Sequence, residues 1–98
     1  MAKIGIYRIT NLLNNKSYIG SSINLTRRKA EHFYRFRSKR GNSILKNSII
    51  KHGIENFAFD IVEELYFGDW AENDYIKDIL EAREQFYLDT INPEYNIR

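Results

Sequence analysis

The sequence predicts an α/β domain of the α+β type, in which a small central three-stranded antiparallel sheet is flanked by helices in the order β-β-α-α-β-α. Residues 4–10 and 17–22 are rich in Ile and Tyr and enclose an asparagine-rich turn, and residues 57–65 alternate between apolar and other side chains. The remaining segments carry apolar residues at helical spacing. A chain of 98 residues can bury one core but not two, so we expect one domain over residues 1–98.

The first two strands, "IGIYRIT" and "SYIGSS", are predicted to form a β-hairpin. The connecting residues "NLLNNK" contain asparagines, which tolerate the positive φ angles of a tight turn. The hairpin would bring Tyr7 and Tyr18 close together on neighbouring strands. Gly5 and Gly20 would leave bare backbone there, as glycines in strands do at a bulge or where another group approaches closely.

Two helices are expected next. Asn24 is a suitable N-cap for a helix over residues 25–36, in which Leu25, Phe33 and Phe36 have helical spacing. Residues 37–42 read as a basic loop. Residues 43–53 are predicted to form the second helix, with Gly53 at its end.

The third strand and a long helix complete the expected fold. In residues 57–65 the apolar positions of a half-buried strand are Phe57, Phe59, Ile61 and Leu65. Residues 66–73 are expected to form a loop from which Trp70 returns to the core.

The last helix is predicted over residues 74–90, where apolar side chains follow helical steps. The stripe consists of Ile76, Leu80, Tyr87 and Ile91. Glu84 falls on the same stripe, and a carboxylate among apolar positions indicates a possible functional residue.

The net charge of +2 hides an uneven distribution. Residues 1–53 contain 12 Lys and Arg and one acidic residue, whereas residues 54–98 contain 3 Lys and Arg and 12 Asp and Glu, so the halves carry +11 and −9. This asymmetry favours a polyanionic partner for the first half. The alternative is that the two halves pair with each other across the fold.

Composition excludes several classes of protein. The chain has no cysteine, which rules out disulfides and thiolate metal sites, and its two histidines do not make a zinc cluster. No apolar run approaches the roughly 20 residues needed to span a bilayer, and the start of the chain lacks the apolar region of a signal peptide. We therefore expect a soluble, intracellular protein.

Five side chains could together carry chemistry: Tyr7, Tyr18, Arg28, His32 and Glu84. Arg28 and His32 are four residues apart, so they share one face of their helix. In phosphodiester hydrolysis a carboxylate can hold a divalent metal ion, a guanidinium can neutralise the phosphate, and a phenol or imidazole can handle the proton of the attacking water. The set therefore suits this reaction.

Each of these residues also has a structural interpretation. The two tyrosines could be a packed cross-strand pair. Arg28 could be a solvated charge, with Arg27 as a competing candidate for its role. His32 could lie on the surface of a basic helix, and Glu84 could be exposed without a function.

The motifs occur in a specific order. The sequences "GIY" at 5–7 and "YIG" at 18–20 are followed by "TRRKAEH" with an R-x-x-x-H spacing, then by "KHG", "AREQFY" and "YNI". This ordered set resembles the GIY-YIG nuclease family over essentially the whole chain, from Gly5 to Ile97. The resemblance is greatest to the catalytic domains of phage-type and intron-encoded homing endonucleases.

The resemblance implies the catalytic domain of a DNA endonuclease that hydrolyses phosphodiester bonds by a one-metal mechanism, leaving a 5′-phosphate and a 3′-hydroxyl. It implies that Tyr7 is the general base or orients the attacking water, and that Tyr18 organises water and phosphate. Arg28 would bind the scissile phosphate, and His32 would support proton transfer. Glu84 would bind the divalent metal, Mg²⁺ or Mn²⁺. Because a free phenol has a pKa of about 10, Tyr7 as a base would need help from a cation such as Arg28.

The resemblance also implies supporting roles. Gly5 and Gly20 would shape the site, and Asn96 of "YNI" would structure it. Homing members often carry a further histidine or a polar residue before the second helix, where "KRGNSIL" has Arg40, Gly41 and Asn42 instead, so a secondary role is left open there. Basic residues around Arg28 would hold the DNA backbone through salt-sensitive contacts; these are Arg27, Lys29, Arg35, Arg37, Lys39 and Arg40.

Homing relatives usually attach a further DNA-recognition region after this domain, and we expect such a region as a partner absent from this chain. Other functions fit the residues less well. A non-catalytic nucleic-acid-binding module would not need Tyr7, Arg28 and Glu84 together. A repair or restriction nuclease of the same family would keep the site and differ in its target, and a scaffold held by paired charges would neither cut nor bind DNA.

Overall fold

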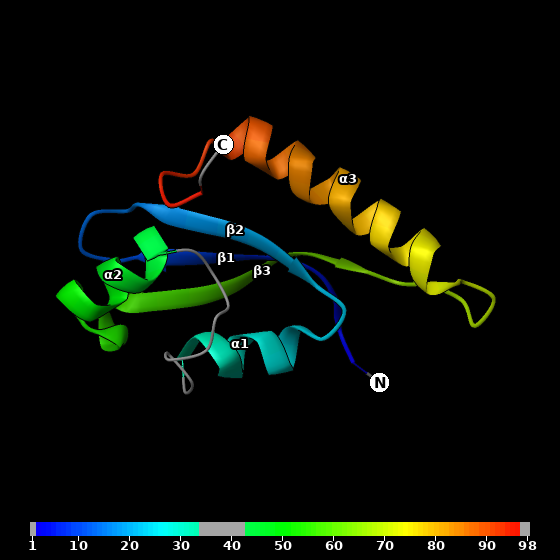
Figure 1. Cartoon of the computed structure of the whole chain (residues 1–98), viewed down its shortest axis with the longest axis horizontal. Helices are drawn as coiled ribbons and strands as arrows, with labels where there is room; N and C mark the ends of the chain where they lie inside the picture. The colour runs from blue at the N-terminus through cyan, green and yellow to red at the C-terminus, as the bar shows by residue number, and fades with distance from the viewer. Residues whose placement is uncertain (1, 34–42, 97–98) are drawn as a thin grey trace.

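A computed structural model of the chain describes residues 2–33 and 43–96. In these residues β1 (Ile4–Asn11), β2 (Ser17–Ser22) and β3 (Phe57–Leu65) form one antiparallel sheet in the order β2-β1-β3 (Figure 1). The predicted sheet is therefore confirmed, with β1 as its central strand.

Helices cover both faces of the sheet. Helices α1 (Leu25–Phe33) and α2 (Ser43–His52) lie on one side, and α3 (Asn73–Ile91) lies on the other (Figure 1). A short 3-10 helix, η1 (Ile54–Asn56), leads into β3. The predicted element order is confirmed, and the Oδ1 atom of Asn24 accepts a hydrogen bond of 3.0 Å from the amide of Arg27, as expected of an N-cap.

The β1–β2 hairpin sets the positions of the two motif tyrosines. Tyr7 lies opposite Gly20, and Ile9 lies opposite Tyr18. Because side chains alternate between the faces of a strand, Tyr7 and Tyr18 are diagonal neighbours on the same face. The turn contains Asn15 with a φ of 62°, as its asparagine-rich sequence predicts.

Two separate cores lie on the two faces. Under α3 the buried residues are Ile6, Ile19 and Leu80. On the α1 and α2 side they are Tyr7, Ile9, Leu25, Leu45, Ile49, Phe57 and Tyr95. Alternation along β1 thus sends Ile6 to one core, and Tyr7 and Ile9 to the other.

A β-bulge interrupts the pairing of β1 with β3. Tyr7 lies opposite Ile61, but Ile6 lies opposite Glu63, so Val62 is an extra residue in β3. Gly5 is required beside this bulge, because a Cβ atom at Gly5 would overlap the backbone of Glu63. The bulge also reverses, for the residues of β3 after Ile61, which side chains face each side of the sheet.

Two expectations from the sequence were wrong. Leu65 does not share a face with Phe57 and Phe59; it packs on the α3 side, because the bulge reverses the alternation after Ile61. Trp70 does not return to the core but is 72% exposed, since the β3–α3 loop holds it against the ring of Tyr75, at a centroid distance of 5.4 Å.

Some predictions concern residues outside the described ranges or at the ends of elements. The predicted end of the first helix, Phe36 and the basic loop over 37–42 fall within residues 34–42, which the structure does not describe. Helix α3 ends at Asn92, which has a φ of 52° and donates its amide to the carbonyl of Leu88. Within the described ranges, no helix is both long enough and apolar enough to cross a membrane.

Candidate active site

The hydroxyl of Tyr7 is the centre of a buried polar cluster. It lies 3.0 Å from Nε2 of His32, and the centroids of the two rings are 5.5 Å apart. His32 is 4% exposed and projects from α1 into the domain rather than lying on the surface. A hydroxyl and an imidazole nitrogen at this distance can share a proton, with the direction of donation set by the tautomer of the imidazole.

Gly20 makes room for the phenol of Tyr7. A Cβ atom at position 20 would overlap the Cζ and hydroxyl of Tyr7, which lies opposite it in the sheet. The ring of Tyr7 is held on its other side by Phe59, which stacks on it at a centroid distance of 5.0 Å and an angle of 13°. The phenol is therefore positioned between a bare strand and an aromatic ring.

Tyr18 completes the aromatic part of the cluster. Its ring centroid is 6.2 Å from that of Tyr7 and 6.0 Å from that of His32. The cross-strand pair expected from the sequence is present, and it encloses a buried imidazole. A purely structural aromatic pair would not need this buried polar group, which must be hydrogen-bonded to avoid a desolvation cost.

The structure distinguishes Arg28 from its competitor Arg27. Nη1 of Arg28 donates to the carbonyl of Ser21 over 3.1 Å, and its side chain is 19% exposed. The side chain of Arg27 is 60% exposed and faces Glu31, at 3.7 Å. Only Arg28 therefore joins the cluster, with its guanidinium oriented by the backbone of β2.

Electrostatics keep both phenols protonated. Burial raises the pKa of Tyr7 well above its ordinary value; neighbouring Tyr18 adds to the rise, and Arg28 opposes it. Burial also raises the pKa of Tyr18, and the negative charge of Glu84 raises it further. Arg28 does assist Tyr7 in the expected direction, but burial is the larger effect, so Tyr7 is a neutral phenol at neutral pH.

Glu84 approaches the cluster from α3. This helix packs along β2 on the opposite face, and the influence of Glu84 on Tyr18 places its charge near the cluster. The side chain is half-buried, and within the described part of the chain no hydrogen bond or ion pair neutralises it. Tyr7, Tyr18 and His32 are thus in contact, Arg28 acts on Tyr7, and Glu84 acts on Tyr18 through its charge.

Among the candidate residues, a single carboxylate could hold a divalent metal ion. Across the described residues there is no group of three or more His, Asp or Glu that could hold a metal, which excludes an all-protein cage there. A single carboxylate such as Glu84 fits Mg²⁺, which is often held by one or two carboxylates together with substrate phosphates and water. The donor set therefore fits a metal that is completed by the substrate.

Asn96 fastens the chain's last described residues to β2. Its Oδ1 accepts from the amide of Ile19, and its Nδ2 donates to the carbonyl of Ile19, both over 2.8 Å. The amide of Tyr95 also donates to the carbonyl of Ser17 over 2.9 Å. Tyr18 lies between these two attachment points.

The basic surface is described only in part. Arg27 and Lys29 are exposed on α1, whereas Arg35, Arg37, Lys39 and Arg40 lie outside the described residues. The ion pairs between described residues, Arg27–Glu31, Arg28–Glu31 and Arg83–Glu63, each join residues of the same half of the chain. These pairs therefore do not neutralise the basic half with the acidic half.

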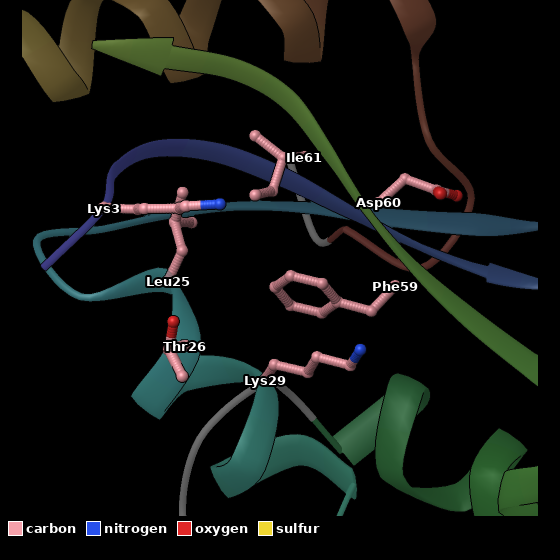
Figure 2. Close-up of a pocket in the computed structure, with 7 residues that line it drawn as sticks. All are labelled: Lys3, Leu25, Thr26, Lys29, Phe59, Asp60 and Ile61. Carbon is pink, nitrogen blue, oxygen red and sulfur yellow. The ribbon is translucent and has the colours of Figure 1, made fainter. Parts of the chain in front are cut away.

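A cavity of about 400 Å³ lies between α1 and β3, beside the cluster (Figure 2). None of the five candidate residues lines it. Lys29 stands at its lower edge, with Nζ 6.0 Å from the ring centroid of Phe59, and Lys3 projects over the opposite side. The cavity is separate from the cluster, although Phe59 contributes to both.

Sequence reasoning missed two supports of the site. Phe59, read as a core residue, forms the wall behind Tyr7, and the Ser21 carbonyl orients Arg28. The alternation of β3 shows that Phe59 faces the core, but its contact with Tyr7 depends on a pairing that only the folded sheet supplies. Glu63 and Arg83, which form an ion pair beside Glu84, were also missed.

The chain is similar to known proteins in sequence and in fold. Residues 3–96 match the family described as the GIY-YIG catalytic domain. The chain is 37% identical over 95 residues to Intron-associated endonuclease 1 of Enterobacteria phage T4, covering 96% of this chain and 35% of the relative. It is 38% identical over 61 residues to Probable intron-encoded endonuclease 1 of Neurospora crassa, covering 62% of this chain and 19% of the relative. The chain thus spans about a third or less of these relatives.

Two solved structures have the same fold. One is the catalytic domain of homing endonuclease I-TevI, with 34% identity, a TM-score of 0.76, and coverage of 98% of this chain and 99% of that one. The other is a point mutant of the catalytic domain of intron endonuclease I-TevI, with 33% identity, a TM-score of 0.78, and coverage of 98% and 94%. The similarity extends over nearly all of the chain.

Proposed function

The chain belongs to the GIY-YIG catalytic domain family, and from this membership we propose that it is the catalytic domain of a homing endonuclease that hydrolyses phosphodiester bonds in DNA. The observation that carries the proposal is the buried contact between Tyr7 and His32, which lies beside Arg28 and within the electrostatic reach of Glu84. The family implies a need for a divalent metal ion, and we propose Mg²⁺ or Mn²⁺.

Tyr7 and His32 act together as a proton relay. Because the phenol stays protonated at neutral pH, Tyr7 accepts a proton from the attacking water only as it passes its own hydroxyl proton to Nε2 of His32. The resulting hydroxide attacks phosphorus and the P–O3′ bond breaks. The departing O3′ takes a proton from solvent, so the products carry a 5′-phosphate and a 3′-hydroxyl. The relay needs no phenolate as a separate species.

The remaining residues manage charge and position. Arg28, held by the Ser21 carbonyl, stabilises the negative charge that develops on the phosphate oxygens. Tyr18 orients water and phosphate beside Tyr7. Glu84 would hold the divalent ion, which when bound supplies Lewis-acid stabilisation of the phosphate and the leaving oxygen. Arg27 and Lys29 hold the DNA backbone without reading its sequence.

The test is nicking of supercoiled plasmid by the purified chain with Mg²⁺ or Mn²⁺. We expect Glu84→Gln and Arg28→Ala each to lower the rate by roughly 10²–10³-fold, because each removes a group that stabilises transition-state charge. Glu81→Gln, which changes an exposed carboxylate one turn away on α3, is the matched control and should cut normally. EDTA should abolish cleavage.

The outcomes separate the proposal from its alternatives. Full activity in Glu84→Gln would contradict the role of the carboxylate in the reaction. DNA binding without cleavage, at high protein concentration and with either metal, would favour a binding module or a need for a further DNA-recognition region. Tethering the chain to an unrelated DNA-binding domain distinguishes these two, because only the second would then cut.

A further inference from the structure

A three-residue tether joins α3 to β3 next to Glu84. The Oε1 atom of Glu63 lies 2.8 Å from Nε of Arg83 and accepts a hydrogen bond of 3.1 Å from the hydroxyl of Tyr87. The guanidinium of Arg83 also lies over the rings of Phe86 and Tyr87, at 4.7 and 5.5 Å. We call Glu63, Arg83 and Tyr87 the tether.

The β-bulge creates this tether. Without the extra residue Val62, Glu63 would point to the face that holds Tyr7, because alternation places Ile61 there. With the bulge, Glu63 lies opposite Ile6 and faces α3. The β-bulge therefore follows Ile61, which lies opposite Tyr7, and it directs Glu63 towards α3, the helix that carries Glu84.

The tether and Glu84 act in different directions from α3. Successive helix residues point about 100° apart, so Arg83 and Glu84 project in different directions from one turn. Arg83 reaches β3, whereas the charge of Glu84 acts on Tyr18 in β2, and β1 lies between these strands. A change in the contact of Arg83 with Glu63 would therefore allow α3 to rotate about its axis. This rotation would change the position of Glu84.

We propose that Glu63 is a positioning residue for Glu84, because its contacts with Arg83 and Tyr87 set the rotation of α3 relative to the sheet. This inference rests on the proposed nuclease function, since it assumes that the place of the Glu84 carboxylate matters for cleavage. Beneath α3 the packing consists of Leu80, which is the one buried residue of this helix in the described chain, and of the partly buried Ile76, Tyr87, Leu88 and Ile91. The hydrogen bonds of Glu63 are directional, so they add an angular preference to this packing.

The test compares Glu63→Ala with wild type in plasmid nicking and in DNA binding. We expect kcat to fall by roughly 10- to 100-fold, since a displacement of about 1 Å in a catalytic group has an effect of that order. The KM for DNA should change less than about twofold, and the Mg²⁺ concentration for half-maximal rate should rise. Glu63→Gln keeps an oxygen acceptor for Arg83 and Tyr87, so it should recover most of the rate.

Two control variants separate position from stability. Leu88→Ala removes packing from the same helix and should lower the melting temperature without changing the Mg²⁺ dependence. Glu64→Ala removes the neighbouring carboxylate, which lies opposite Gly5 and outside the tether, and should cut normally. Partly exposed ion pairs contribute little to stability, so a large loss of rate in Glu63→Ala would be a positional effect.

A readout independent of cleavage is the set of backbone amide signals in NMR spectra. Rotation of α3 should shift signals along the whole helix and in β2 when Glu63 is replaced. Shifts confined to residues next to positions 63, 83 and 87 would overturn the proposal.

The rates distinguish the failure of this inference from failure of the proposed function. If wild type cuts, Glu84→Gln does not, and Glu63→Ala retains wild-type kcat and Mg²⁺ dependence, then the tether is wrong and the function stands. If wild type does not cut, or if Glu84→Gln cuts as well as wild type, the proposed function fails. There is then no reaction for which the tether would position Glu84.

Discussion

The two faces of β1 differ in chemistry although they belong to one strand. Towards α3 the strand presents Ile6, which packs with Ile19 and Leu80 in an aliphatic core. Towards α1 it presents Tyr7, whose hydroxyl is hydrogen-bonded to the buried His32. The comparison teaches that both faces of the sheet are packed cores, and that the face towards α1 also holds a buried polar contact between Tyr7 and His32.

The largest expected effect tests the aliphatic face. Ile6→Ala should lower the free energy of unfolding by about 2–5 kcal/mol, because it removes buried methyl groups and leaves a cavity beneath α3. Nicking at low temperature, corrected for the folded fraction, should remain near wild type. Denaturant unfolding measures the first quantity. A loss of kcat in fully folded Ile6→Ala would show that the two faces are not separable.

Gly20→Ala tests the opposite face. The added methyl group would overlap the phenol of Tyr7, so the ring must move away from His32. We expect nicking to fall by roughly 10²-fold through misplacement of the hydroxyl, and the free energy of unfolding to fall by about 1–3 kcal/mol through overpacking. Gly68→Ala, in an exposed loop where the added methyl group meets the exposed indole of Trp70, is the control. Normal cleavage by Gly20→Ala would exclude the buried hydroxyl from the reaction.

Alkaline pH should weaken the face that carries Tyr7. The pKa of this phenol is raised in the folded state above its unfolded value of about 10, so the unfolded chain loses the proton first. The free energy of unfolding should therefore fall above about pH 10, by about 1.4 kcal/mol per pH unit for this group. Denaturant titrations at several pH values measure the slope. Tyr7→Phe should have a shallower slope, and equal slopes in the two proteins would contradict the burial effect.

Trp70 provides the smallest effect. Because this side chain is 72% exposed and belongs to neither core, Trp70→Ala should change the free energy of unfolding by no more than about 0.5 kcal/mol. Thermal melts monitored by circular dichroism would detect a larger change. A loss above that value would restore the expectation that the indole stabilises the domain.

Much of the fold follows from local patterns. The strands and helices appear where alternation, helical spacing and the Asn24 cap predict them, because those signals depend on neighbouring residues. Leu65 was misplaced because a single extra residue at Val62 reverses the alternation, and a bulge leaves no mark in the pattern of polarity. Trp70 was misplaced because hydrophobicity alone does not show where a loop runs.

The candidate site was less predictable from the sequence than the secondary structure was. The helical spacing of Arg28 and His32 suffices to place them on one face. The opposition of Tyr7 and Gly20 depends on the hairpin register, and the approach of Glu84 depends on how α3 is laid across the other face. These are long-range pairings, which a single sequence does not specify. The roles of the five residues in cleavage remain predictions for the variants above.

The attachment of residues 94–96 to β2 also bears on how copies of the chain meet. β2 is an edge strand, and an edge with unpaired amides and carbonyls invites another chain to add a strand. Here Asn96 occupies both backbone groups of Ile19, while Tyr95 and Glu94 occupy those of Ser17. The segment thus acts as a cover against strand addition. Asn96→Ala would uncover Ile19, and its consequence would be self-association that grows with protein concentration.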